Sequence, residues 1–132
     1  MEKFRYLSLE WAAEAQMRLQ RDLTPEKMKH LTSSMVTVYT HCPDGVERAV
    51  YYQLVDGVVT EVTLHQGEPP QAEFSITADY GTFARISQAE LKARAALMSG
   101  KMTLKGNLVK ALRLAPVVDR LNEVLATIPT EY

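Results

Sequence analysis

The sequence predicts a single α+β domain over residues 1–132, in which helices cover a mainly antiparallel sheet. Two patterns support this fold class. Apolar residues recur with a helical period near the N-terminus and again after Asp79, whereas the middle of the chain alternates apolar and polar residues between short turns. The length of 132 residues and the hydrophobic fraction of 46% fit one domain with one core.

The N-terminal part begins with a predicted helix that Ser8 caps and that extends to about Gln20. Its apolar side consists of Leu9, Ala12, Ala13, Ala15 and Leu19. The sequence Thr24-Pro25-Glu26 predicts a second, short helix with the proline at its first position. Residues Met35 to His41 then predict a strand that ends at the turn Pro43-Asp44-Gly45.

The middle of the chain contains a predicted β-hairpin around the two-residue turn Asp56-Gly57. Counting outward from the turn pairs Val55 with Val58, Gln53 with Thr60, Tyr51 with Val62 and Ala49 with Leu64. This set is mostly apolar, so it is the predicted covered face, and the opposite face with Tyr52, Leu54 and Val59 is predicted to be partly covered. After a break at Gly67-Glu68-Pro69-Pro70, residues Glu73 to Ala78 predict another strand.

The C-terminal half returns to a helical period. Ser87-Gln88-Ala89-Glu90 fits a capping box and predicts a helix that ends at Gly100. Residues Lys101 to Lys105 alternate, which predicts a short strand with Met102 and Leu104 on one dry face.

Two further helices complete the predicted fold. Asn107 caps a helix from Leu108 to Leu112, and Pro116 lies in the first turn of a last helix that Pro129 ends. The buried stripe of this last helix is predicted to contain Val117, Leu121, Val124 and Ile128.

Charge and cysteine content narrow the functional classes. The net charge of −1 gives no overall field that would recruit nucleic acid, and the single Cys42 fits a reducing compartment. Because no apolar run approaches 18 residues and the N-terminus lacks a signal-peptide core, we expect a soluble, cytoplasmic protein.

The charges are unevenly placed along the chain. Seven acidic residues and one basic residue lie from Asp44 to Asp79, whereas seven basic residues and one acidic residue lie from Lys92 to Arg120. Two interpretations remain open: solvated faces that differ in sign, or a basic rim that meets lipid headgroups or an acidic partner.

No residue pattern in the sequence predicts a catalytic or metal centre. His30, His41 and His65 lie in different elements without the spacing of metal ligands, and no dinucleotide fingerprint is present. We therefore expect no metal, no cofactor and no enzymatic activity. One catalytic alternative is a hydrolase that uses Cys42, with His41 or His65 as its base.

Three segments carry a resemblance to a known family. They are Ala96 to Leu114 (ALMSGKMTLKGNLVKALRL), Phe74-Ser75-Ile76, and Tyr80 to Ile86. Together they resemble the sterol carrier protein 2 family, in its single-domain bacterial type. The segment LEWAAEAQ and the hairpin from Arg48 to Val62 fit that type more loosely, so the resemblance spans nearly the whole chain.

The resemblance implies a five-stranded sheet covered by helices that enclose an apolar lipid cavity, of roughly 300–1,000 Å³ if it is typical of ligand sites. The expected ligand is a fatty acid, an acyl-CoA, a sterol-like lipid or an isoprenoid lipid. The expected lining residues are Phe74, Ile76, Phe83, Ile86, Leu91, Leu97, Met98, Met102, Leu104, Leu108, Leu112, Leu121 and Leu125.

The implied function is non-catalytic binding and transfer of such a lipid, with transient membrane contact and a protein partner or homodimer as further expectations. The alternative is an accessory subunit that presents a lipid to an enzyme of lipid or quinone metabolism.

Overall fold

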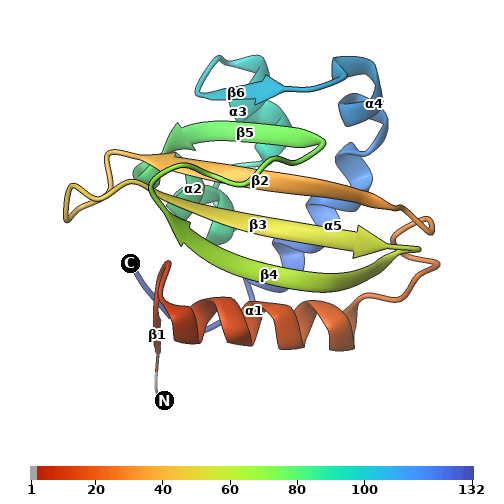
Figure 1. Cartoon of the computed structure of the whole chain (residues 1–132), viewed down its shortest axis with the longest axis horizontal. Helices are drawn as coiled ribbons and strands as arrows, with labels where there is room; N and C mark the ends of the chain where they lie inside the picture. Colours follow the sequence, from red (N-terminus) through yellow and green to blue (C-terminus); the bar gives the residue numbers. More distant parts are fainter. Residues whose placement is uncertain (1–2) are drawn as a thin grey trace.

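The computed structural model describes residues 3–132 and confirms an α+β fold built on a five-stranded sheet (Figure 1). The strands of this sheet are β2 (Ser33–Thr40), β3 (Arg48–Val55), β4 (Val58–Gln66), β5 (Phe74–Asp79) and β6 (Met102–Lys105). Their spatial order is β4-β3-β2-β5-β6, and every neighbouring pair is antiparallel except β2 and β5. This parallel pair arises because residues 67–73 run back across the sheet before β5 begins.

Helices cover one face and one edge of the sheet. On the face turned away from the viewer in Figure 1 lie α2 (Tyr80–Ser87), α3 (Ala93–Met98), α4 (Leu108–Arg113) and α5 (Ala115–Leu125). The longest helix, α1 (Leu9–Asp22), lies along β4 at the edge of the sheet. Near the chain ends, β1 (Phe4–Arg5) pairs in parallel with β7 (Thr130–Glu131), a pairing that the sequence pattern did not predict.

An aromatic cluster joins the β1–β7 pair to the core. The Tyr6 ring packs edge-on against Trp11, with a centroid distance of 5.0 Å, and also contacts Tyr132 at 4.8 Å. The Tyr6 hydroxyl donates a hydrogen bond to the Tyr39 hydroxyl at 3.2 Å, and Tyr39 packs on Phe83. Burial raises the pKa of Tyr39 to about 12, so this hydroxyl stays protonated and keeps its place in the core.

Several predicted helix ends are confirmed by their hydrogen bonds. The Ser8 hydroxyl accepts a hydrogen bond from the Trp11 amide at 3.1 Å and caps α1. The Asn107 side chain accepts from the Lys110 amide at 3.1 Å and caps α4. The apolar stripe predicted for the last helix is buried. Val117, Leu121 and Val124 lie in α5, and Ile128 follows it.

The predicted capping box at Ser87 is wrong. Ser87 is the last residue of α2, which begins earlier because the Asp79 carboxylate accepts a hydrogen bond from the Thr82 amide at 2.7 Å. Ala89 has a left-handed φ of 60°, which breaks the chain between α2 and α3. The short helix predicted at Thr24-Pro25-Glu26 is likewise absent from the described residues, where 25–30 form turns.

The predicted hairpin turn at Asp56-Gly57 is confirmed, but the register beyond it is wrong. Val55 pairs with Val58 as predicted, whereas Gln53 lies opposite Glu61 because a bulge leaves Thr60 unpaired. The covered face is therefore the one with Tyr52, Leu54, Val59 and Val62, which are all buried. The residues predicted to be covered include Val55 and Val58, which are 46% and 41% exposed.

Two glutamines of α1 bind the free backbone edge of β4. Gln20 Nε2 donates to the Val59 carbonyl at 2.9 Å, and Gln16 Oε1 accepts from the Val62 amide at 3.0 Å. Because β4 is an edge strand, these side chains occupy groups that would otherwise pair with another chain. These two hydrogen bonds thus hold α1 in place and protect the edge of the sheet.

We expect the double substitution of Gln16 and Gln20 by Ala to lower the free energy of unfolding by about 1–2 kcal/mol, since two hydrogen bonds are lost. We also expect concentration-dependent self-association, because the edge of β4 becomes free to pair. Urea denaturation and light scattering measure the two effects. Gln71→Ala, which changes an exposed glutamine in the loop before β5, is the matched control. An unchanged stability for the double variant would contradict this role of α1.

Candidate functional site

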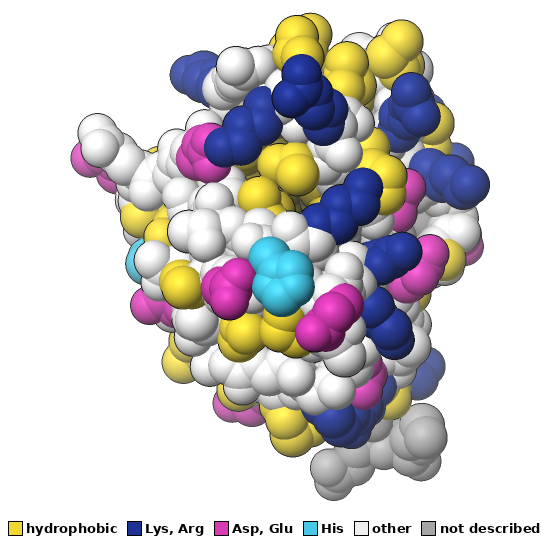
Figure 2. Space-filling view, turned by 90° about the vertical axis from the view of Figure 1, so that its right-hand side faces the viewer, with side chains coloured by type: hydrophobic (Ala, Val, Ile, Leu, Met, Phe, Trp, Pro, Cys, Tyr) yellow, Lys and Arg dark blue, Asp and Glu magenta, His cyan; other side chains and the backbone are white. Residues whose placement is uncertain are grey.

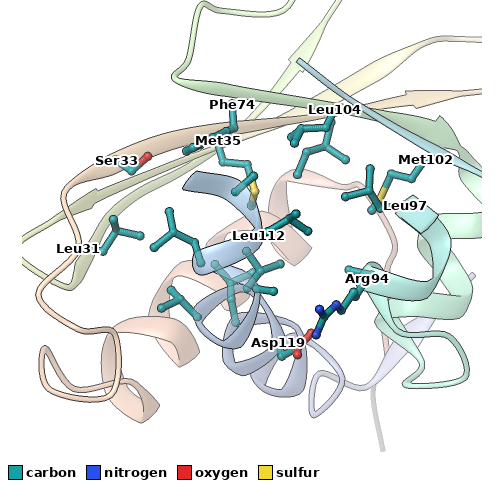
Figure 3. A pocket seen from close by; sticks show the side chains of 18 of the residues that line it. Leu31, Ser33, Met35, Phe74, Arg94, Leu97, Met102, Leu104, Leu112 and Asp119 are labelled. Carbon is teal, nitrogen blue, oxygen red and sulfur yellow. The ribbon is translucent and has the colours of Figure 1, made fainter. Parts of the chain in front are cut away.

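An apolar pocket lies between the sheet and the helices α3, α4 and α5 (Figure 3). Its apolar lining consists of Leu31, Met35, Leu54, Phe74, Ile76, Ala93, Leu97, Met102, Leu104, Ala111, Leu112, Leu114, Ala115, Val117, Val118 and Leu121. Four polar residues complete the lining: Ser33, Ser34, Arg94 and Asp119. In Figure 3 the side chains of Arg94 and Asp119 point toward each other at one end of the pocket, away from the sheet.

The register of β6 brings the sequence-predicted strand residues into this pocket. Leu104 lies opposite Ile76 and Met102 lies opposite Ala78, so both side chains project toward the helices. Figure 3 shows them beside Leu97 of α3. The dry face that the alternation from Lys101 to Lys105 predicted is therefore a wall of the pocket.

The free volume of the pocket is about 100 Å³, which is below the predicted range of roughly 300–1,000 Å³. The difference has a visible cause, since Met35, Leu97, Met102 and Leu112 point into the space (Figure 3). Methionine and leucine side chains change rotamer readily, and methionine adapts to varied shapes. A larger space therefore requires these side chains to adopt other rotamers.

The structure divides the thirteen sequence-predicted residues into groups. Seven of them line the pocket: Phe74, Ile76, Leu97, Met102, Leu104, Leu112 and Leu121. Phe83, Ile86 and Leu125 line a neighbouring space of about 40 Å³. This space shares six walls with the pocket: Met35, Ile76, Ala93, Met102, Val118 and Leu121. Leu91 lies at a separate depression between the segment after α2 and helix α5.

The remaining two predicted residues, Met98 and Leu108, lie on the surface. Met98 is 76% exposed and Leu108 is 53% exposed. The inward side of α3 is formed by Ala96 and Leu97, and the helix is only six residues long, so Met98 at its end points outward. Leu108 is the first residue of α4, whose pocket-facing residues are Ala111 and Leu112, so Leu108 also points outward.

Sequence reasoning missed the wall that β2 and β3 contribute. Met35 and Leu54 line the pocket, although the hairpin face with Leu54 was predicted to be only partly covered. The alternation in β3 was visible in the sequence, but the bulge at Thr60 shifts the register and changes which residues of β4 share the covered face.

A polar latch joins α4 to the sheet beside the pocket. The Glu73 carboxylate accepts hydrogen bonds from Lys110 Nζ and from the Ser33 hydroxyl, each at 2.5 Å. Lys110 Nζ also lies 6.0 Å from the centroid of the Phe74 ring. The bond to Lys110 and then that to Ser33 hold the pKa of Glu73 below its usual value. Because α4 carries Leu112, this latch positions one wall of the pocket.

The geometry around Cys42 gives no support to a nucleophilic thiol. Cys42 is buried, its Sγ lies 3.6 Å from the Tyr39 carbonyl oxygen, and burial raises the pKa of the thiol. A reactive cysteine needs the opposite shift. Within residues 3–132 no three His, Cys, Asp or Glu side chains come together as a metal site. None of the helices in the same part of the chain has the length and apolar character needed to cross a membrane.

Comparison with known proteins identifies the family. The chain belongs to the SCP-2 sterol transfer family, whose model matches residues 54–119. None of the curated protein sequences compared gives a significant match.

Solved structures show the same fold. The crystal structure of a sterol carrier protein 2 is 22% identical, with a TM-score of 0.83 over 94% of this chain and 99% of that one. A conserved hypothetical protein from Thermus thermophilus is also 22% identical, with a TM-score of 0.83 over 99% of this chain and 94% of that one. Palmitated SCP2L2 from Aedes aegypti is 20% identical, with a TM-score of 0.60 over 84% of this chain and 94% of that one.

We expect Glu73→Gln to destabilise the protein by up to about 1 kcal/mol at neutral pH, because the pair with Lys110 is partly exposed. The folded-state pKa of Glu73 is below its usual value of 4.5, so the contribution is complete above that pH. It is lost as the pH falls through the lower folded-state pKa. Urea denaturation at several pH values should therefore show wild type and variant converging in acid. Glu68→Gln, at an exposed position, is the control, and a difference that grows in acid would contradict the latch.

Proposed function

We propose that this protein is a non-catalytic carrier that binds one lipid with an acyl or isoprenoid chain in the pocket between β6 and helices α3, α4 and α5. The observation that carries the proposal is the lining itself, which is apolar apart from Ser33, Ser34, Arg94 and Asp119. Binding in such a pocket gains free energy from removing the lipid chain from water, at about 0.8 kcal/mol for each buried methylene.

The polar groups of the lining favour a ligand with a chain and a polar end. Arg94 is exposed and Asp119 is partly buried, and both lie at the end of the pocket away from the sheet. A polar head group at the end of an alkyl chain finds a guanidinium donor in Arg94 and a carboxylate acceptor in Asp119. The family membership and the palmitated relative support a fatty acyl chain as the first probe.

The proposed lining comprises the ten predicted residues of the two neighbouring spaces, and Leu121 of α5 is the most informative of them. It is 3% exposed and forms a wall of both spaces. A larger side chain at this position fills the space that the ligand needs. The strands and the latch at Glu73 remain unchanged by such a substitution.

We expect Leu121→Trp to weaken binding of a fluorescent fatty acid at least about tenfold while the fold is retained, with a stability cost of about 1–3 kcal/mol from overpacking. Fluorescence titration measures affinity, and thermal melting by circular dichroism measures stability. The control is Val58→Trp, which adds the same side chain at a 41% exposed site in the hairpin. Full affinity in a destabilised Leu121→Trp protein would place Leu121 in an ordinary core and contradict the proposed site.

A further inference from the structure

The space of about 40 Å³ beside the pocket differs from the pocket in its chemistry. We call it the inner space. Five of its lining residues carry a hydroxyl group, and they are Tyr6, Thr37, Tyr39, Tyr52 and Ser87. The pocket itself is apolar apart from four residues of its lining. A space of this size has room for one small polar group or a water molecule.

Tyr52 brings an unpaired hydroxyl group to the inner space. It is 2% exposed, and within residues 3–132 its hydroxyl has no hydrogen-bond partner. Its neighbours across the sheet are Met35 of β2 and Val62 of β4, whose side chains carry no oxygen or nitrogen atom. Burial raises the pKa of Tyr52 well above its ordinary value, so the hydroxyl keeps its proton. It is a buried donor without an acceptor, which costs free energy until an acceptor is bound.

The other hydroxyl-bearing residues of the inner space are already hydrogen-bonded. The Tyr6 hydroxyl donates to the Tyr39 hydroxyl at 3.2 Å, and the Thr37 hydroxyl donates to a backbone carbonyl of β3 at 3.3 Å. Ser87 Oγ accepts from the Tyr132 hydroxyl at 2.9 Å. Each of these residues therefore has a partner within the protein, unlike Tyr52.

The indole nitrogen of Trp11 is also buried without a partner among the described residues, but its setting is different. Trp11 lines neither the pocket nor the inner space, and its ring packs edge-on against Tyr6 with a centroid distance of 5.0 Å. At Tyr52, by contrast, an unpaired donor coincides with a space that can receive its partner.

The outer end of the pocket has a charged character. Arg94 lines the pocket there and is exposed, and the neighbouring helix α4 carries Lys110 and Arg113. Figure 2 shows Lys and Arg side chains gathered among hydrophobic ones on the face of the molecule to which α4 belongs. A lipid therefore finds charged partners for its head group at the outer end and uncharged hydroxyl groups at the inner end.

We propose that the inner space is a subsite for an uncharged oxygen atom of the lipid. This oxygen belongs to a hydroxyl or carbonyl group on the chain, remote from the head group, and Tyr52 donates a hydrogen bond to it. The inference rests on the proposed function, since the rest of the same chain occupies the pocket. Two of the shared walls are Met35 and Met102, whose side chains change rotamer readily and so open the way between the spaces. The carrier thus selects oxygenated chains over plain alkyl chains, which leave the Tyr52 donor unpaired.

Competition for a bound fluorescent fatty acid tests this proposal with the full chain. The probes are palmitate and palmitates that carry one hydroxyl group beside the carboxylate, in the middle of the chain, or at the terminal carbon. We expect a probe hydroxylated at the middle or the terminal carbon to bind about tenfold more tightly than palmitate. The probe hydroxylated beside the carboxylate should bind like palmitate, because its hydroxyl stays at the outer end.

Tyr52→Phe should abolish this preference, because the donor is lost while the ring remains. The matched control is Tyr51→Phe, the same change at the next residue, whose side chain projects to the opposite face of the sheet and lines neither space. This control should keep the preference. Ligand-free Tyr52→Phe should also be at least as stable to urea as wild type, because the hydroxyl has no partner to lose.

Three results would overturn the proposal: equal affinities for palmitate and all hydroxylated probes, a preference that persists in Tyr52→Phe, or a clear loss of stability in ligand-free Tyr52→Phe. The palmitate measurement separates this proposal from the carrier function. Palmitate binding without any preference would refute the inner subsite alone, whereas no binding of any probe would refute the carrier function and the subsite together.

Discussion

The pairing of β6 with β5 is the interaction on which the rest of the site depends. This four-residue strand sets Met102 and Leu104 under the helices, and it fixes where α3 ends and α4 begins. Gly106 makes the exit from β6 possible. Its φ is 135°, and a Cβ atom there would lie 2.8 Å from the Phe74 ring and 3.0 Å from the Glu73 carbonyl oxygen. The chain thus turns into α4 in direct contact with the start of β5, where the latch forms.

Local patterns predicted the elements of this fold, and tertiary packing decided how they pair. The turn at Asp56-Gly57 and the caps at Ser8 and Asn107 depend on neighbouring residues, and the structure has all three. The parallel pairing of β2 with β5 depends on contacts between segments far apart in the chain. The bulge at Thr60 lies within the hairpin, between Val59 and Val62, whose backbone groups bind Gln20 and Gln16 of α1. No helix begins at the capping box predicted at Ser87, because the Asp79 side chain caps the earlier helix α2, of which Ser87 is the last residue.

For the candidate site, too, local patterns predicted some of the residues, and tertiary packing decided the others. Alternation over two residues was enough to predict that Met102 and Leu104 share a covered face, because a strand has only two faces. A helix of six residues shows too little of its period for an apolar stripe to be recognised, so Met98 and Leu108 were assigned to the wrong side of α3 and α4. Predicting the pocket walls that β2 and β3 contribute would have required the register of the whole sheet.

The small free volume of the pocket and the exposure of Met98 and Leu108 are both connected with α3 and α4. In α3 only Ala96 is buried, and α4 has no buried residue, whereas α1 and α5 each bury four. Elements that bury little apolar surface open at low free-energy cost. Expansion of the pocket from about 100 Å³ is therefore easiest at α3 and α4, where the polar latch rather than core packing holds the second helix. The walls that would move to admit the proposed lipid belong to the same elements that expose Met98 and Leu108.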